Sequence, residues 1–137
     1  MLAIGTAPKL GKAEIAALIR RAEEAGAKAG ADRIPEPMHV IERANPWDDR
    51  SPIVKRYAPI EGGVCGFAWI TVRPGNSPVA NYLKNTGKGR TDSYAGGVMV
   101  WVSQYGQSME RKVAYAYAYA SVLRDAGVKA YAGDRMD

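Results

Sequence analysis

Cysteine and histidine are almost missing from this chain, whose 137 residues include one cysteine, Cys65, and one histidine, His39. A single cysteine cannot form an internal disulfide or a cysteine-based zinc cluster. A single histidine excludes a histidine-rich metal site and any mechanism that needs two histidines. We therefore expect no metal and no cofactor. We also expect a protein that is not an enzyme, because the sequence holds no recognisable catalytic constellation.

Long apolar runs are also missing. None approaches the ~20 residues that cross a membrane, and the first residues lack the pattern of a signal peptide, so we expect a cytoplasmic protein without a membrane partner. Hydrophobic residues make up 47% and charged residues 24% of the chain, a balance typical of globular domains. The length predicts a single domain over residues 1–137, large enough to bury a core without a disulfide.

Positive charge is in excess, with 19 Lys and Arg against 14 Asp and Glu and a formal net charge of +5. The excess is concentrated in residues 62–106, which carry four cations and one anion. Lys84, Lys88 and Arg90 form the most one-sided part of this stretch. Such a cluster is typical of a surface that contacts phosphates, and the alternative is a solvated basic loop over residues 88–96.

Three segments have the pattern of helices. Residues 12–29 repeat apolar side chains along one helical face. Residues 77–87 begin with serine and proline, which favour a helix start, and end at glycine. Residues 109–126 follow a serine N-cap and carry an apolar stripe.

Two segments, 64–72 and 97–103, are apolar at both alternating sets of positions, which is typical of central strands covered on both faces. We expect these two strands to be adjacent. Shorter strands are expected at residues 38–43, at 53–57 and at 128–132. The order of the elements predicts an α+β fold, with a mixed four- to five-stranded sheet and three helices packed on it.

The run Gly66-Phe67-Ala68-Trp69-Ile70-Thr71-Val72 resembles the RNP1 strand of RNA-recognition domains. In that motif alternate aromatic side chains lie on an open sheet face and stack on bases, and here Phe67 and Trp69 would be the stacking pair. Cys65 replaces the basic residue of the motif, Val72 replaces its last aromatic, and the second RNP segment would fall near residues 2–5, which hold no aromatic. We favour the alternative, a core strand whose aromatics are buried under helices.

Three further aromatic residues are candidate binding residues. Trp47 lies in a loop rich in Asn, Pro and Asp, where it is either an exposed anchor for a partner or packed against the domain. Tyr115 and Tyr119 flank the apolar stripe of the last helix, and we expect them to form the self-complementary face of a homodimer. The alternative is that residues 1–31 fold back and cover both tyrosines within one chain.

Three runs of the C-terminal half are considered together: residues 73–77 (RPGNS), 101–112 (WVSQYGQSMERK) and 123–131 (LRDAGVKAY). Together they resemble small uncharacterised proteins encoded by bacteriophages. The resemblance implies an accessory protein that acts in the cytoplasm of a bacterial host cell.

We therefore predict a small basic protein that binds without catalysis and whose partner is nucleic acid or a host nucleoprotein. The alternative prediction is a protein–protein interaction or virion-assembly protein, whose positive charge serves only solubility.

Overall fold

The computed structural model describes residues 10–137, and this part of the chain forms three helices and six strands. In chain order they are α1 (Lys12–Asp32), β1 (Ile41–Arg43), β2 (Ile53–Arg56), β3 (Gly66–Arg73), α2 (Pro78–Asn85), β4 (Arg90–Thr91), β5 (Val98–Trp101), α3 (Met109–Asp125) and β6 (Lys129–Met136). The α+β class is confirmed, and all three predicted helices form close to their expected bounds. The basic loop expected over residues 88–96 contains the short strand β4.

The main sheet has four strands in the order β4-β5-β3-β6. Every neighbouring pair is antiparallel, and β3 pairs with β5 on one side and with β6 along its full length on the other. The predicted adjacency of β3 and β5 is confirmed, whereas the expected mixed sheet is wrong. β5, α3 and β6 do form a strand–helix–strand unit with parallel strands, but β3 lies between the two strands and runs opposite to both.

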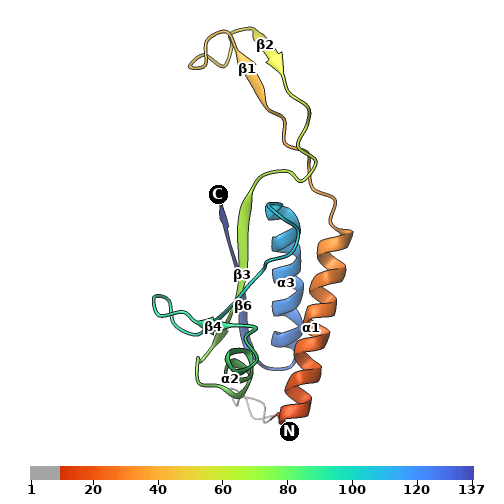
Figure 1. The fold of residues 1–137 in the computed structure, drawn as a ribbon, viewed down its shortest axis with the longest axis vertical. Helices are drawn as coiled ribbons and strands as arrows, with labels where there is room; N and C mark the ends of the chain where they lie inside the picture. The colour runs from red at the N-terminus through yellow and green to blue at the C-terminus, as the bar shows by residue number, and fades with distance from the viewer. Residues whose placement is uncertain (1–9) are drawn as a thin grey trace.

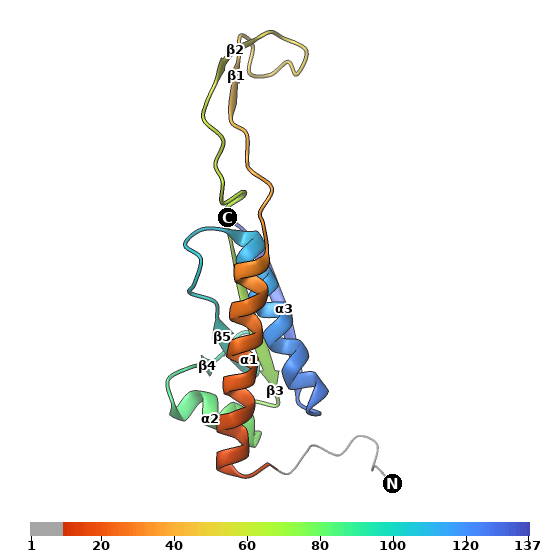
Figure 2. The same cartoon turned by 90° about the vertical axis from the view of Figure 1, so that its right-hand side faces the viewer.

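The two long helices lie on the same side of the main sheet (Figure 1). α3 packs directly on β3 and β6, and α1 packs along α3. Figure 2 shows the same arrangement from the helix side, with α1 in front. The core between these layers is built from buried side chains of both helices and of the strands, including Leu18, Ile19, Ile70, Val72, Leu83, Val98, Ala116, Ala120 and Leu123.

Within residues 10–137, helices cover only one face of the main sheet. Residues of β3 alternate between buried and half-buried positions, and Phe67, Trp69 and Thr71 lie on the face opposite the helices. The expectation of two covered faces is therefore wrong, as is the favoured interpretation of Phe67 and Trp69 as core residues. The physical reason is that α1 packs on α3 and leaves the far face of the sheet open.

Two glycines of α1 make room for tyrosine rings that come from α3 and from the loop before it. A Cβ atom at Gly26 would lie 2.9 Å from the ring of Tyr115, and one at Gly30 would lie 2.5 Å from the ring of Tyr105. The Tyr105 hydroxyl donates a hydrogen bond of 3.1 Å to the carbonyl oxygen of Ala27. The two tyrosine rings therefore occupy the space that larger residues of α1 would need.

We expect Gly26→Val to lower the free energy of unfolding by about 1–3 kcal/mol, because the added methyl groups overpack a tight helix contact. Chemical denaturation measures this loss. Ala27→Val, at an exposed position of the same helix, is the matched control and should cost less than about 0.7 kcal/mol through helix propensity alone. Equal losses from both variants would show that the close approach of the helices is not tight.

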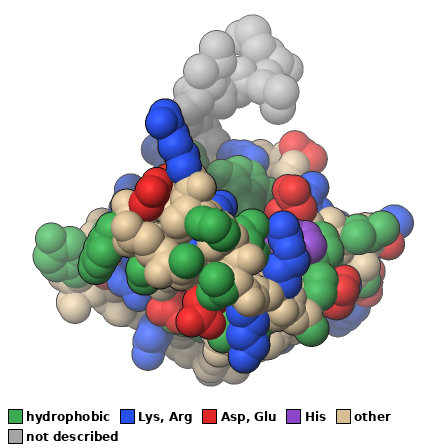
Figure 3. Space-filling view, turned by 90° about the horizontal axis from the view of Figure 1, so that it is seen from above, with side chains coloured by type: hydrophobic (Ala, Val, Ile, Leu, Met, Phe, Trp, Pro, Cys, Tyr) green, Lys and Arg blue, Asp and Glu red, His purple; other side chains and the backbone are tan. Residues whose placement is uncertain are grey.

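Residues between α1 and β3 form an arm that projects from the rest of the molecule (Figures 1 and 2). Its two strands, β1 and β2, pair with each other and contact no other helix or strand of the described chain. Trp47, in the loop between them, is 95% exposed, so packing of Trp47 against the domain is excluded. Figure 3 looks onto the arm end of the molecule, where apolar, basic and acidic side chains are mixed.

Candidate nucleic-acid interface

The open face of the main sheet carries four aromatic side chains from three strands. Phe67 and Trp69 come from β3, Trp101 from β5 and Tyr131 from β6. The strand register places all four on the same side, since Trp69 lies opposite Trp101 and Tyr131 lies opposite Thr71. Trp101 is 40% and Tyr131 51% exposed, so their rings are accessible to a ligand.

The rings of this cluster lie against one another. Trp69 and Trp101 are nearly parallel, with 5.7 Å between ring centroids and 6° between ring planes, and Phe67 lies 5.5 Å from Trp101. A Cβ atom at Gly133 would lie 2.6 Å from the Trp69 indole. The missing side chain of Gly133 therefore lets the Trp69 ring lie over β6, and the two stacked indoles present aromatic surface against which a base can pack.

Positive side chains surround these rings. Four cations share the open face by strand register: Arg73, Arg90, Lys129 and Arg135. The Arg135 guanidinium carbon lies 5.4 Å from the centroid of the Phe67 ring, within the range of a cation–π contact. Among residues 10–137, no strand position on this face carries a carboxylate. We call the four aromatic and four basic side chains the aromatic face.

A buried lysine lies beside one end of the aromatic face. Lys112 of α3 is 5% exposed, and its Nζ donates a single long hydrogen bond of 3.4 Å to the carbonyl oxygen of Gly66. The Nζ also lies 5.5 Å from the centroid of the Phe67 ring. No carboxylate within the described part of the chain forms a salt bridge with it. Because burial of an unpaired charge is unfavourable, an anionic group near Phe67 would be stabilised here.

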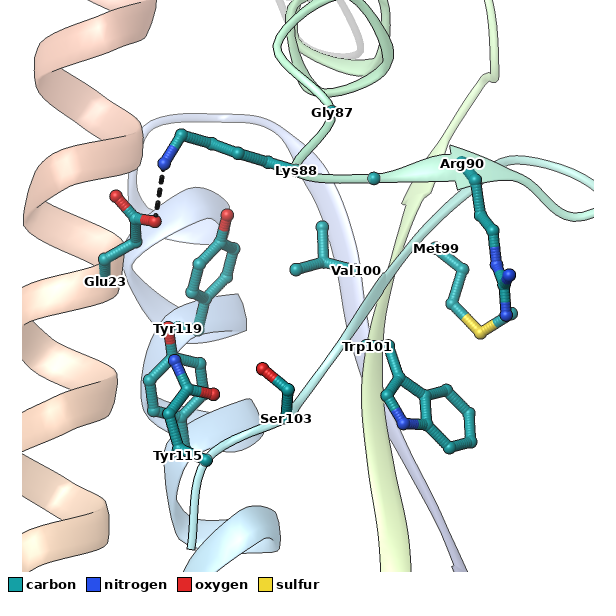
Figure 4. A pocket seen from close by; sticks show the side chains of 12 residues that line it. Glu23, Gly87, Lys88, Arg90, Met99, Val100, Trp101, Ser103, Tyr115 and Tyr119 are labelled. Atoms are coloured by element: carbon teal, nitrogen blue, oxygen red, sulfur yellow. Dashed lines mark hydrogen bonds and ion pairs between the residues drawn. The ribbon is translucent and has the colours of Figure 1, made fainter.

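A pocket of about 380 Å³ opens at the outer edge of β5, next to the aromatic face (Figure 4). β4 pairs with β5 only at Met99 and Val98, and the chain before β4 turns away to α2. The pocket lies where a longer β4 would have continued. Its far wall is formed by Tyr115 and Tyr119 of α3 and by Glu23 of α1.

The charges around this pocket are partly neutralised. The Lys88 ammonium lies 2.9 Å from the Glu23 carboxylate, the ion pair drawn in Figure 4. Burial raises the pKa of both Tyr115 and Tyr119, and the carboxylate of Glu23 raises it further. Both tyrosine hydroxyls are therefore protonated at neutral pH and can donate hydrogen bonds.

The structure changes the roles of the two candidate tyrosines. Tyr115 is 5% and Tyr119 1% exposed, and α1 packs over the helix that carries them. The homodimer face predicted for these residues is therefore wrong. The alternative, in which the N-terminal helix covers them within one chain, is confirmed. The apolar side chains on several sides of α3 exist because this helix lies between the sheet and α1.

The three predicted basic residues do not all share one surface, although Lys88 and Arg90 both line the pocket. Arg90 belongs to the aromatic face, Lys88 is paired with Glu23, and Lys84 lies in the last turn of α2. Trp47 lies at the arm and takes no part in either site. Trp101 was not predicted as a site residue because both faces of its strand were expected to be covered, and the cations of β6 were not predicted because only the pairing of β6 with β3 brings them to this face.

The second RNP segment, expected near residues 2–5, lies outside the described residues. The aromatic partners of Phe67 and Trp69 come instead from β5 and β6. The alternating aromatics of β3 were the one signal in the sequence that indicated this face.

Comparison of the chain with protein-family models, with curated proteins and with solved structures gives no match in any of the three. No helix between residues 10 and 137 is both long enough and apolar enough to cross a membrane. The same residues contain no group of three or more His, Cys, Asp or Glu side chains that could hold a metal ion. The geometry of the aromatic face and of the adjoining pocket is therefore the basis for a functional argument.

Proposed function

We propose that this protein binds single-stranded nucleic acid on the aromatic face and catalyses no reaction. The observation that supports this proposal is that packed aromatic rings and an excess of positive charge share one uncovered sheet face. Stacking of a base on an aromatic side chain contributes roughly 1–3 kcal/mol. Flanking cations contact the phosphates and add affinity that depends on salt.

A single strand suits this face better than a duplex does. The bases of a duplex are paired and stacked inside the helix, so their flat faces cannot lie on Trp69 and Trp101. An unpaired strand can turn its bases onto aromatic side chains. Because every base has a flat face, binding through the aromatic face tolerates many sequences.

One feature favours the alternative function, a protein–protein interaction or a role in virion assembly. The strands β1 and β2 of the arm contact no other helix or strand of the described chain, and Trp47 and Val54 on the arm are 95% and 60% exposed. A nucleoprotein partner would combine both functions, with nucleic acid on the aromatic face and protein at the arm. The phage-encoded origin and the bacterial cytoplasm stay predictions from the C-terminal half of the sequence.

Salt-dependent binding tests the proposal. We expect an oligothymidylate of about twelve nucleotides, within the usual size of such sites, to bind at low salt and to dissociate as salt rises. Replacing Arg73, Lys129 and Arg135 by alanine should reduce the slope of log affinity against log salt by about 0.7 for each lost phosphate contact. Fluorescence anisotropy of a labelled oligonucleotide gives this slope.

The matched control removes the same charge from α1. Arg20, Arg21 and Lys28 are exposed there, and their replacement by alanine should leave the salt slope unchanged. If the wild-type protein does not bind at low salt, or if both triple variants have the same slope, the aromatic face is not a nucleic-acid site.

A further inference from the structure

The pocket at the edge of β5 is continuous with the aromatic face. Arg90 and Trp101 line the pocket and also belong to that face. Figure 4 shows both side chains on one side of β5, with Tyr115 and Tyr119 on the other. A nucleic-acid strand that stacks on Trp101 therefore passes next to the pocket, with only β5 between the two.

The backbone of β5 offers free hydrogen-bonding groups to the pocket. The Val102 N–H donates to the Ala68 carbonyl oxygen on β3, and successive residues of an antiparallel strand direct their backbone groups to alternate sides. The N–H and C=O of Trp101 therefore point to the outer edge. On this outer side no strand residue of the described chain pairs with Trp101, because β4 begins at Arg90, which lies opposite Met99. One donor and one acceptor side by side can pair with the edge of a base.

Side chains complete the lining with further polar groups. Ser103 and Gln104 follow β5 into the pocket. The amide and the hydroxyls can donate and accept hydrogen bonds, and Val100 supplies an apolar contact. A flat heterocycle with a polar edge fits such a lining.

The mouth of the pocket is basic. It is formed by residues 87–90, with the sequence Gly-Lys-Gly-Arg. Lys88 has three N–H donors and its side chain is partly exposed, as is that of its partner Glu23. Because an exposed ion pair of this kind is weak, the Lys88 ammonium can leave Glu23 and contact a phosphate.

We infer that this pocket takes one nucleotide of the strand that the aromatic face holds. The base lies against the outer edge of β5, next to Ser103 and Gln104, and its phosphate lies beside Lys88. This inference rests on the proposed function, and turning one base out of a single strand costs little because no base pair is broken. It makes binding selective for the base at one position, while the rest of the strand is held without selectivity.

Nucleoside 5′-monophosphates test the pocket without the need for a strand. In the isotope-labelled protein, we expect at least one of the four common monophosphates to shift the amide resonances of Gly89, Trp101 and Gln104. Inorganic phosphate alone should leave the Trp101 and Gln104 resonances unchanged. Ser103→Phe should fill the pocket from an exposed position and raise the Kd of the monophosphate by about tenfold or more.

Two variants keep the test independent of folding. Gln104→Ala removes a polar group at an exposed position and should also weaken the monophosphate. Ser121→Phe, at an exposed position of α3 away from the pocket, is the matched control and should have no effect.

The outcomes separate this inference from the proposed function. If oligothymidylate binds but no monophosphate shifts these resonances, the pocket inference is overturned and the proposed function stands. Shifts that persist in Ser103→Phe, or that inorganic phosphate reproduces at Trp101, overturn it as well. If the monophosphates shift these resonances and the oligonucleotide does not bind, the pocket stands and the aromatic face fails.

Discussion

Replacing Trp69 and Trp101 together by alanine is expected to weaken oligothymidylate binding by at least about thirtyfold. Two stacking contacts are lost, each contributing roughly 1–3 kcal/mol. Their nearly parallel rings, 5.7 Å apart, form the centre of the aromatic face, so no neighbouring side chain can replace both. Fluorescence anisotropy at constant salt measures the change.

The same double variant should stay folded. A strand covered on both faces would predict a loss of about 3–5 kcal/mol for Trp101→Ala alone. Because the ring is 40% exposed, we expect a loss nearer to about 1–2 kcal/mol at this position. Trp69→Phe with Trp101→Phe is the control that keeps aromatic rings and should retain most of the affinity. Native affinity in the alanine variant would contradict the proposed function.

The second large effect is expected from Lys112→Met, which should weaken oligonucleotide binding without lowering the stability of the fold. Methionine has a similar length and no charge, and replacing a buried charge by a well-packed apolar side chain is often neutral or stabilises by about 1–4 kcal/mol. We therefore expect an unchanged or higher free energy of unfolding. Loss of the positive charge near Phe67 should weaken oligonucleotide binding by about tenfold, the value of one charge-assisted contact.

Two measurements on one protein sample decide this prediction: chemical denaturation and anisotropy. Lys28→Met is the control, because Lys28 is an exposed cation of α1 and its replacement should change neither quantity much. A Lys112→Met variant that is markedly less stable would assign the lysine a structural role, through its bond to the Gly66 carbonyl and its contact with the Phe67 ring.

The helices and the central strands could be predicted because the pattern of their apolar residues is visible within short segments of the sequence. Residues 12–29 and 109–126 repeat at helical spacing, and β3 and β5 stand out as apolar runs. The insertion of β3 between β5 and β6 could not be predicted, since strand order depends on pairing across long distances in the chain. Hydrophobicity also failed to show which face of β3 is covered, because Trp69 and Ile70 are both apolar. The difference lay in size and shape, with aromatic rings outward and aliphatic side chains inward.

The candidate site, too, could be predicted only where its residues lie close together in the sequence. Phe67 and Trp69 were visible as an alternating pair within one strand, so their role as a stacking surface could be considered from sequence. Arg135 could not be associated with Phe67, because the two residues meet only through the pairing of β3 with β6. The tyrosines of α3 were misassigned for a related reason, since nothing local shows that α1 packs over them.

If the aromatic face binds nucleic acid as proposed, the position of β6 as an outer strand links that binding to the integrity of the fold. β6 is held along one side by β3, and outer strands of this kind open more readily than central ones. A nucleic-acid strand that spans Trp101 of β5 and Arg135 of β6 binds only when both strands are in place. The ligand would then stabilise the sheet with β6 paired, relative to the state in which β6 has opened. The gain is RT ln(1 + [L]/Kd), about 2.7 kcal/mol when the ligand concentration is a hundred times Kd. Occupancy of the face and the pairing of β5, β3 and β6 would then be coupled in one equilibrium.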